Sequence, residues 1–291
     1  MTRIGFIGLG IMGGPMAAHL AGAGHQVTGY ARKPEAARKL TDAGGTPVDS
    51  VAAAVADAEV VITMLPNHPE VEEVVLGDAG VLANATDGLL FIDMSSIRPE
   101  TSVEIAERGV ETGVRVLDAP VSGGQAGAEN GTLSIMVGGT AEDYDAARPL
   151  FDILGGTIVH VGPHGAGQTV KAANQLVVAG IYTLVSEAIV LLEASGVDAK
   201  AGLDVLAGGL AANRILDLKR ETMLRREFKP GFRIDLHHKD MGIVVDAARE
   251  AGVALPVTGV TAQLMAAARA MGLGDLDHSA LLTVIERLSG R

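Results

Sequence analysis

The first half of the chain alternates short apolar runs with amphipathic stretches. Several apolar runs end at glycine or proline, as buried parallel strands do. The stretches between them have helical periodicity, for example Pro15–Ala23 and Pro34–Ala43. This alternation predicts a doubly wound, largely parallel sheet, the α/β class of fold. The expected strands are Arg3–Gly8, Gln26–Ala31, Glu59–Leu65, Leu89–Met94, Val114–Leu117, Leu133–Val137 and Ile158–Val161.

The pattern changes after Gly162-Pro163-His164-Gly165, and no convincing strand follows. A long apolar helical segment, 168–195, opens the second half of the chain. The sequence therefore predicts an N-terminal α/β domain over residues 1–163 and an all-α domain over residues 164–291, joined by this long interdomain helix. The other expected helices are 199–209, 211–226, 236–251, 257–271 and 278–289.

Composition narrows the classes of function. A length of 291 residues favours two domains, each with enough chain for its own core. The net charge of -12 and the absence of a basic block argue against nucleic acid as a partner. The chain has no cysteine, so it can form neither disulfides nor thiolate metal sites. We expect a cytoplasmic protein whose partner is a small molecule.

The segment 176–192 is apolar enough to suggest a membrane span. It contains Tyr182, Thr183, Ser186 and Glu187, whereas a spanning helix needs about 20 apolar residues nearly free of charge. A buried core helix explains the segment better. No membrane partner is therefore expected.

A glycine motif joins the first expected strand to the first expected helix. Gly8, Gly10 and Gly13 have the G-x-G-x-x-G spacing of a dinucleotide-binding turn. In such a turn the first glycine permits the tight bend, the second lets the backbone approach the pyrophosphate, and the third lets helix pack on strand. Glycine-rich turns are common, but this one lies where dinucleotide binding requires it. We therefore expect the α/β domain to be a Rossmann-type domain that binds a dinucleotide.

The end of the second expected strand indicates which dinucleotide. NAD-binding domains usually carry an acidic residue there, about 20 positions after the glycines, to bind the ribose hydroxyls. This chain has Ala31, Arg32 and Lys33 instead. Arg32 can bind a 2′-phosphate with two hydrogen bonds, and Lys33 adds positive charge. The pattern favours NADP, with NAD still possible; a solvated strand end is the alternative interpretation.

Ser122-Gly123-Gly124 follows the expected strand Val114–Leu117, at the carboxyl edge of the sheet. Ligands of doubly wound sheets bind at that edge. Ser122 offers a hydroxyl group, and the two glycines can present successive N–H groups to an anion. The segment is a candidate site for a small carboxylate, and an ordinary Ser-Gly-Gly turn is the alternative.

Lys171 and Asn174 stand three residues apart on the expected long helix, so they share one face. Isolated helical lysines are usually solvated charges. Lys171, however, has apolar or small neighbours on both sides, which would partly desolvate its ammonium group. The pair is therefore a candidate for chemistry rather than for solubility.

No motif in the chain favours a metal. His237 and His238 are adjacent, so they cannot form the i, i+4 pair of a helical zinc site. The sequence also has no phosphate-binding G-K-[ST] loop and no G-x-S-x-G elbow. Metal-dependent, nucleotide-hydrolase and serine-hydrolase interpretations have no support.

Taken together, these motifs resemble the β-hydroxyacid dehydrogenase family, which includes 3-hydroxyisobutyrate dehydrogenase. The similarity covers essentially the whole chain. Its motifs are Gly5–Gly13, Asp118–Gly124, Gly131–Ser134, Lys171–Gln175 and Lys239-Asp240. Within the family, three stretches are most like the tartronate semialdehyde reductases: Asp93–Ile97, Phe228–His237 and Asp277–Leu281.

The resemblance implies roles for individual residues. Lys171 would be catalytic, and the substrate would be held by Ser122, Gly123, Gly124 and Asn174. The cofactor would also contact Ile11, Met12, Leu65, Ser96 and Lys239. The resemblance further implies a homo-oligomer, a homodimer or homotetramer, built through the helical domains.

The expected reaction is reversible, NADP(H)-dependent reduction of a short semialdehyde acid to the hydroxy acid, and tartronate semialdehyde to D-glycerate is the favoured case. Lys171 would act as the general acid/base, since a lysine with its reference pKa of about 10.4 is protonated near neutral pH. Other semialdehydes of the same family, such as methylmalonate semialdehyde and succinic semialdehyde, are the alternatives. An imine reductase or a non-catalytic NADP-binding protein is less favoured, because Ser122, Lys171 and Asn174 occur together.

Overall fold

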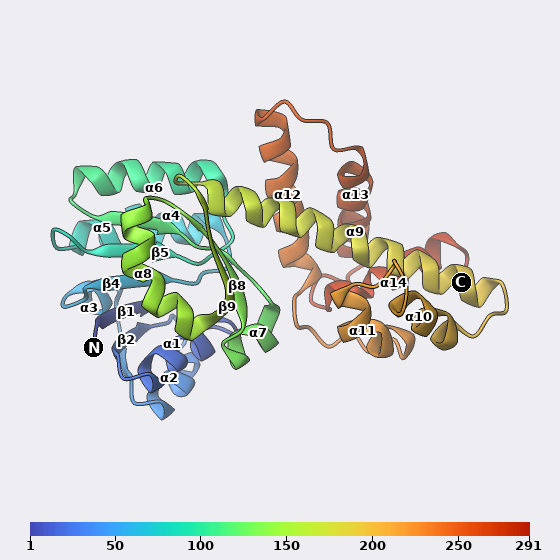
Figure 1. The fold of residues 1–291 in the computed structure, drawn as a ribbon, viewed down its shortest axis with the longest axis horizontal. Helices are drawn as coiled ribbons and strands as arrows, with labels where there is room; N and C mark the ends of the chain where they lie inside the picture. Colours follow the sequence, from blue (N-terminus) through green and yellow to red (C-terminus); the bar gives the residue numbers. More distant parts are fainter. The chain divides into compact units, whose positions relative to one another are not determined.

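The computed structural model describes residues 1–291, which form two compact units, Met1–Lys171 and Ala172–Arg291 (Figure 1). The division falls inside one long helix, α9 (Ala166–Ala194). Residues 166–171 of this helix therefore belong to the α/β unit, and the rest belongs to the helical unit. The fold class expected from the sequence is confirmed.

The first unit contains a nine-stranded sheet in the order β3-β2-β1-β4-β5-β6-β8-β7, with β9 also paired to β8. The first six strands run parallel, in the 3-2-1-4-5-6 order of a Rossmann domain. The strands are β1 (Arg3–Ile7), β2 (Gln26–Tyr30), β3 (Thr46–Val48), β4 (Val60–Thr63), β5 (Leu90–Asp93), β6 (Arg115–Asp118), β7 (Val121–Ser122), β8 (Leu133–Gly138) and β9 (Gly155–Gly162).

Helices cover both faces of this sheet, because successive strand residues point to opposite sides. In β1, Ile4 and Phe6 enter one hydrophobic core, and Ile7 enters the other. The first core is closed by α1 (Gly13–Gly22), α7 (Gly124–Asn130) and α8 (Ala141–Leu154). The second is closed by α3 (Val51–Val55), α4 (His68–Leu76), α5 (Val81–Asn84) and α6 (Pro99–Glu111). A short helical pair, η1 (Pro34–Ala37) and α2 (Arg38–Asp42), follows β2.

Three strands of the sheet differ from the expectation. β3 and β7 were not predicted, and β9 begins at Gly155 rather than at Ile158. β3 is a three-residue edge strand containing Pro47, and β7 has only two residues, so neither shows a recognisable period. β7 also pairs antiparallel with β8, as β6 does, so this edge of the sheet is mixed.

The second unit is entirely helical, as expected. Its core is built from α9 residues such as Tyr182 and Ile189 together with buried apolar side chains from every later helix. The predicted helix 211–226 is shorter in the structure, and 278–289 is divided into a 3-10 turn and a helix. The elements are α10 (Ala199–Ala207), α11 (Arg214–Leu224), α12 (Ile234–Glu250), α13 (Pro256–Ala270), η2 (His278–Ala280) and α14 (Leu281–Leu288).

By length and composition alone, α9 could cross a membrane. Core helices of soluble proteins meet the same criterion, so one such helix is weak support for a span. Within its own unit α9 buries Ala179, Tyr182, Ser186 and Ile189 among the helices around it. This packing agrees with the core-helix interpretation.

Candidate functional site

The three glycines of the N-terminal turn have different surroundings. A Cβ added at Gly8 would lie 2.3 Å from the Met64 carbonyl oxygen, and one added at Gly13 would lie 1.9 Å from the Gly8 carbonyl oxygen. A Cβ at Gly10 would meet nothing within 4 Å. The fold therefore requires glycine at positions 8 and 13 but not at position 10. A ligand that approaches the backbone closely, such as a pyrophosphate, would explain why position 10 is a glycine.

We therefore expect Gly10→Ala to fold normally and to bind the cofactor poorly. Alanine in a compatible conformation changes stability by less than ~1 kcal/mol, whereas a methyl group in the pyrophosphate space should raise the Kd for NADPH ~10-fold or more. Fluorescence titration with NADPH and thermal unfolding measure the two effects. Gly13→Ala is the matched control and should lower the melting temperature. Unchanged NADPH affinity in Gly10→Ala would contradict this assignment.

A pocket of about 590 Å³ opens beside this turn. It lies at the carboxyl ends of β1, β2 and β4. Its lining includes Gly8, Gly10, Arg32, Lys33 and Leu65. Ile11 is exposed next to the turn, and Met12 is half-buried against the first core. Of the residues predicted to bind the dinucleotide, Gly8, Gly10, Arg32, Lys33 and Leu65 line this hollow, whereas Ile11, Met12, Gly13, Ser96 and Lys239 are not part of its lining.

Arg32 and Lys33 are both exposed, and no acidic side chain occupies the end of β2. Arg32 also lines a neighbouring hollow of about 810 Å³, together with Arg38. Arg38 pairs with Asp42 at 3.7 Å in the same short helix. Arg38 was not predicted from the sequence, because its approach to this hollow depends on how α2 packs after the strand.

The strand ends beside the pocket are tied together by a buried carboxylate. Asp93 accepts hydrogen bonds from the Thr63 hydroxyl at 2.7 Å and from the Ser95 N–H at 3.1 Å. The Ser95 hydroxyl in turn accepts from the Leu65 N–H at 2.9 Å. Burial raises the pKa of Asp93, and the hydrogen bonds from Ser95 and Thr63 only partly oppose it. This network holds Leu65 and places the half-buried Ser96 directly after it.

A second buried carboxylate, Asp118 at the end of β6, caps the start of α9. It accepts from the Gly165 N–H at 2.8 Å and from the Gln168 N–H at 3.0 Å. Burial raises the pKa of Asp118, and these backbone hydrogen bonds oppose the shift. The Gln168 side chain donates to the Ser95 carbonyl at 2.9 Å and accepts from the Ile97 N–H at 3.1 Å. The first turn of α9 is therefore fastened to the carboxyl edge of the sheet.

Lys171 follows on this anchored turn. It is only 8% exposed, and its Nζ donates to the Val121 carbonyl oxygen at 2.8 Å. Val121 directly precedes Ser122, so the ammonium group lies beside the Ser122-Gly123-Gly124 segment. Ser122 of β7 pairs with Ser134 of β8, Gly123 is the N-cap of α7, and Gly124 is the first residue of α7. The predicted lysine and the predicted carboxylate segment are thus brought together within the first unit.

Asn174 and Lys239 belong to the second unit and are linked there by two residues that the sequence did not single out as site residues. Asn174 Nδ2 donates to Gln175 Oε1 at 2.8 Å, and Gln175 Nε2 donates to Asp240 Oδ2. Asp240 Oδ1 lies 2.9 Å from Lys239 Nζ. Asn174, predicted to bind the substrate, is therefore linked through Gln175 and the buried Asp240 carboxylate to Lys239, predicted to contact the cofactor.

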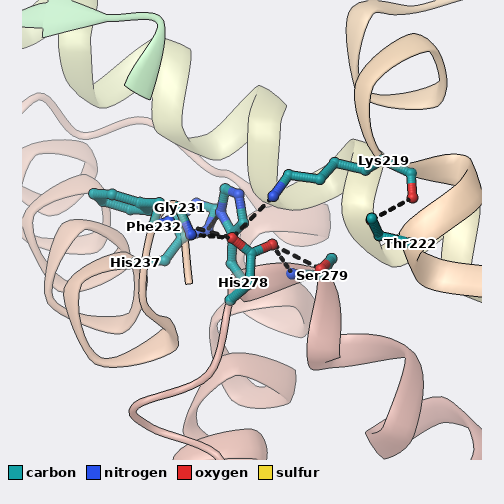
Figure 2. Close-up of polar contacts among 8 residues, drawn as sticks. Lys219, Thr222, Gly231, Phe232, His237, His278 and Ser279 are labelled. Atoms are coloured by element: carbon teal, nitrogen blue, oxygen red, sulfur yellow. Dashed lines mark hydrogen bonds and ion pairs between the residues drawn. The ribbon is translucent and has the colours of Figure 1, made fainter. Parts of the chain in front are cut away.

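His237 and His278 form a buried pair in the helical unit (Figure 2). His237 Nε2 lies 3.2 Å from the Gln175 carbonyl oxygen, and its Nδ1 lies 3.0 Å from Nδ1 of His278. Both rings are buried, and Phe232 packs edge-on against each of them. In this setting the histidines are core hydrogen-bonding groups, and His238 takes no part in the pair.

Asp277 is a buried carboxylate next to His278 in this part of the helical unit. It pairs with Lys219 at 3.0 Å and accepts from the Gly231 N–H at 2.8 Å and the Ser279 hydroxyl at 2.6 Å. Burial acts to raise the pKa of Asp277. The coulombic attraction of His278, the Ser279 hydroxyl, Lys219 and the Gly231 N–H outweigh burial and lower this pKa to about 2, from an ordinary 3.8.

The lowered pKa of Asp277 predicts acid sensitivity of the helical unit. The ionised Asp277 stabilises the folded state fully above pH ~3.8, the pKa of the group in the unfolded chain. This stabilisation is lost as the pH falls through about 2, the pKa in the folded state. The difference corresponds to roughly 2 kcal/mol. We expect Asp277→Asn to be less stable than the parent at pH 7 and to lose less stability between pH 4 and pH 2. Urea unfolding at several pH values tests this, and parallel stability curves for the two proteins would contradict it.

Comparison with known proteins covers nearly the entire chain. Residues 3–162 match the family model for the NAD binding domain of 6-phosphogluconate dehydrogenase. Residues 165–285 match the model described as NAD-binding of NADP-dependent 3-hydroxyisobutyrate dehydrogenase. Both models describe binding of a nicotinamide dinucleotide.

Individual relatives agree with the family models. The 2-hydroxy-3-oxopropionate reductase of Escherichia coli K12 is 41% identical over 287 residues, covering 99% of this chain and 98% of the relative. The 3-sulfolactaldehyde reductase of the same organism is 37% identical and covers 100% of this chain and 98% of its own length. A solved 3-hydroxyisobutyrate dehydrogenase of Mycobacterium tuberculosis, described with L-serine, has a TM-score of 0.88 at 38% identity, covering 98% of this chain and 99% of that one. The chain belongs to the β-hydroxyacid dehydrogenase family of nicotinamide-dependent oxidoreductases.

Proposed function

We propose that this protein catalyses the NADP(H)-dependent, reversible reduction of a short semialdehyde acid to its hydroxy acid, with tartronate semialdehyde to D-glycerate as the favoured reaction. The observation that carries the proposal is the buried Lys171 ammonium group, 2.8 Å from the carbonyl of Val121 and beside Ser122. The relative that is 41% identical, named 2-hydroxy-3-oxopropionate reductase, supports this choice of substrate.

Each proposed residue has a distinct task. The bound nicotinamide cofactor supplies the hydride. Ser122 and the N–H groups of Gly123 and Gly124 bind the substrate carboxylate, and Asn174 binds the carbon chain. Lys171, as an ammonium group, stabilises the negative charge that develops on the aldehyde oxygen and donates the proton. In the reverse direction the neutral lysine accepts that proton.

The proposed cofactor contacts divide between the two units. Gly8, Gly10, Gly13, Ile11 and Met12 would lie along the pyrophosphate. Leu65 and Ser96 follow β4 and β5 and would line the path to the nicotinamide. Arg32 and Lys33 would bind the 2′-phosphate, and Lys239 would contribute from the helical unit. No metal is needed for this chemistry.

A second substrate class is supported by other relatives. The chain is 37% identical to a 3-sulfolactaldehyde reductase and 38% identical to a solved 3-hydroxyisobutyrate dehydrogenase. Methylmalonate semialdehyde, succinic semialdehyde and sulfolactaldehyde therefore belong in the test. The experiment is kcat/KM for each semialdehyde with NADPH and with NADH. Highest efficiency with tartronate semialdehyde and NADPH supports the proposal; another semialdehyde at least ~10-fold better would replace the substrate.

A cytoplasmic homodimer or homotetramer is proposed as the working form. Val177, Leu184 and Leu191 repeat every seven residues along α9 and are 54%, 64% and 67% exposed in the single chain. Such an apolar stripe on a helix is typical of a packing face. Sedimentation of the protein should report an oligomer, and Leu184→Asp should shift it toward the monomer. A monomeric parent protein would contradict the proposal.

A further inference from the structure

Gln175 connects Asn174 to Asp240 in the helical unit. Its side-chain oxygen accepts from Asn174 Nδ2 at 2.8 Å, and its side-chain nitrogen donates to Asp240 Oδ2. Gln175 is 5% exposed and Asp240 is 2% exposed, so water does not readily replace either bond. Asn174 itself is half-buried.

The Asp240 carboxylate, which ends this series of hydrogen bonds, decides how the side-chain amides of Gln175 and Asn174 are oriented. An ionised carboxylate only accepts hydrogen bonds, whereas a primary amide has one donor side and one acceptor side. Asp240 Oδ1 faces the ammonium group of Lys239 at 2.9 Å, and Asp240 Oδ2 is the oxygen that accepts from Gln175. Gln175 must therefore turn its NH2 group toward Asp240 and its oxygen toward Asn174. Asn174 must then turn its NH2 group toward Gln175, which leaves its Oδ1 on the other side.

The backbone of Gln175 is held by α12, the helix that also carries Asp240. His237 and Asp240 stand one turn apart on α12, and His237 Nε2 contacts the Gln175 carbonyl oxygen at 3.2 Å. His237 Nδ1 in turn lies 3.0 Å from Nδ1 of His278 (Figure 2). Because α12 binds both the main chain and the side chain of Gln175, the amide has little freedom to rotate.

We infer that Gln175 and Asp240 are positioning residues that fix the Asn174 amide with its carbonyl oxygen toward the substrate. That oxygen is an acceptor, so the group it binds must be a donor. On a semialdehyde acid, the donor in question is a hydroxyl group on the carbon between the carboxylate and the aldehyde. This inference rests on the proposed function and adds to it a preference for 2-hydroxy substrates.

Two probes that differ only in that hydroxyl group measure the preference: 2-hydroxy-3-oxopropionate and 3-oxopropionate. A site built to bind a substrate hydroxyl discriminates strongly against the analogue that lacks it. We expect the parent protein to favour the hydroxylated probe in kcat/KM by ~10-fold or more. Gln175→Met keeps the side-chain volume and removes both hydrogen bonds, so the Asn174 amide can turn over. In this variant the ratio should fall to within ~3-fold of unity.

Asp240→Asn is the conservative control. Its amide oxygen can still accept from Gln175, so the ratio of the two probes should stay within ~3-fold of the parent value. Asp240→Leu offers no acceptor and should lose the preference as Gln175→Met does. This pair of variants keeps the test open if Gln175→Met does not fold. NADPH affinity and circular dichroism check that each variant is intact.

The outcomes separate the two levels of the proposal. If the parent protein reduces neither probe nor any other semialdehyde, the proposed function fails. If the parent reduces both probes equally, or if an intact Gln175→Met or Asp240→Leu variant keeps the full preference, the positioning role is overturned while the function stands. Loss of the preference in these variants, with retention in Asp240→Asn, supports the inference.

Discussion

Lys171→Ala is expected to lower kcat for semialdehyde reduction by ~10²–10⁴, the usual contribution of one general acid–base group. The side chain is buried, and its Nζ donates to the Val121 carbonyl at the edge of the Ser122-Gly123-Gly124 segment. An alanine there removes both the proton and the positive charge that stabilises the developing alkoxide. Steady-state kinetics at saturating NADPH measures the effect.

The NADPH Kd of Lys171→Ala should stay close to that of the parent, because Lys171 is proposed to act on the substrate oxygen and is not one of the residues proposed to bind the cofactor. Lys171→Arg is the informative companion, since it keeps the positive charge but holds its proton too tightly to donate it. It should retain substrate binding better than alanine and still turn over slowly. Near-normal kcat in Lys171→Ala would remove Lys171 from the mechanism.

Arg32→Ala should weaken NADPH binding far more than NADH binding. A hydrogen bond between charged groups contributes about 1.5–3 kcal/mol, so the Kd for NADPH should rise by roughly 10- to 100-fold. NADH lacks the 2′-phosphate, and its Kd should change by less than ~3-fold. Titrating the variant with both cofactors gives the comparison directly.

Arg38→Ala serves as the matched control for Arg32. It lines the neighbouring hollow but pairs with Asp42 in its own helix. Its effect on NADPH should therefore be smaller than that of Arg32→Ala. An equal loss of NADPH and NADH affinity in Arg32→Ala would contradict the assignment of Arg32 to the 2′-phosphate.

The parallel sheet and the glycine turn could be predicted because their signals are local. Gly8, Gly10 and Gly13 lie between an apolar strand-like run and a segment with helical periodicity. All of these residues are neighbours in the sequence, so the motif can be recognised without knowing the fold. β3 and β7 lack such a signal. They have three and two residues, and each exists because a partner strand supplies its hydrogen bonds.

Lys171 could be selected because a cation among apolar residues is unusual on a helix. The groups that position it could not, since their contacts cross long stretches of chain. Asp118 reaches the Gly165 N–H from 47 residues away, and Ile97 reaches the Gln168 side chain from 71 residues away. The same holds for Gln175 and Asp240, which are 65 residues apart. Spacing within a motif gives no information on such pairs.

The most direct test of the account follows the hydride and its product. The protein is incubated with tartronate semialdehyde and NADPH deuterated at C4 of the nicotinamide, using each of the two C4 labels in turn, and the glycerate formed is analysed by mass spectrometry and NMR. We predict one deuterium at C3 of D-glycerate from one of the two labels, and a rate ~10²–10⁴ lower in Lys171→Ala. Glycerate without deuterium from either label, or no glycerate at all, would contradict the central claim.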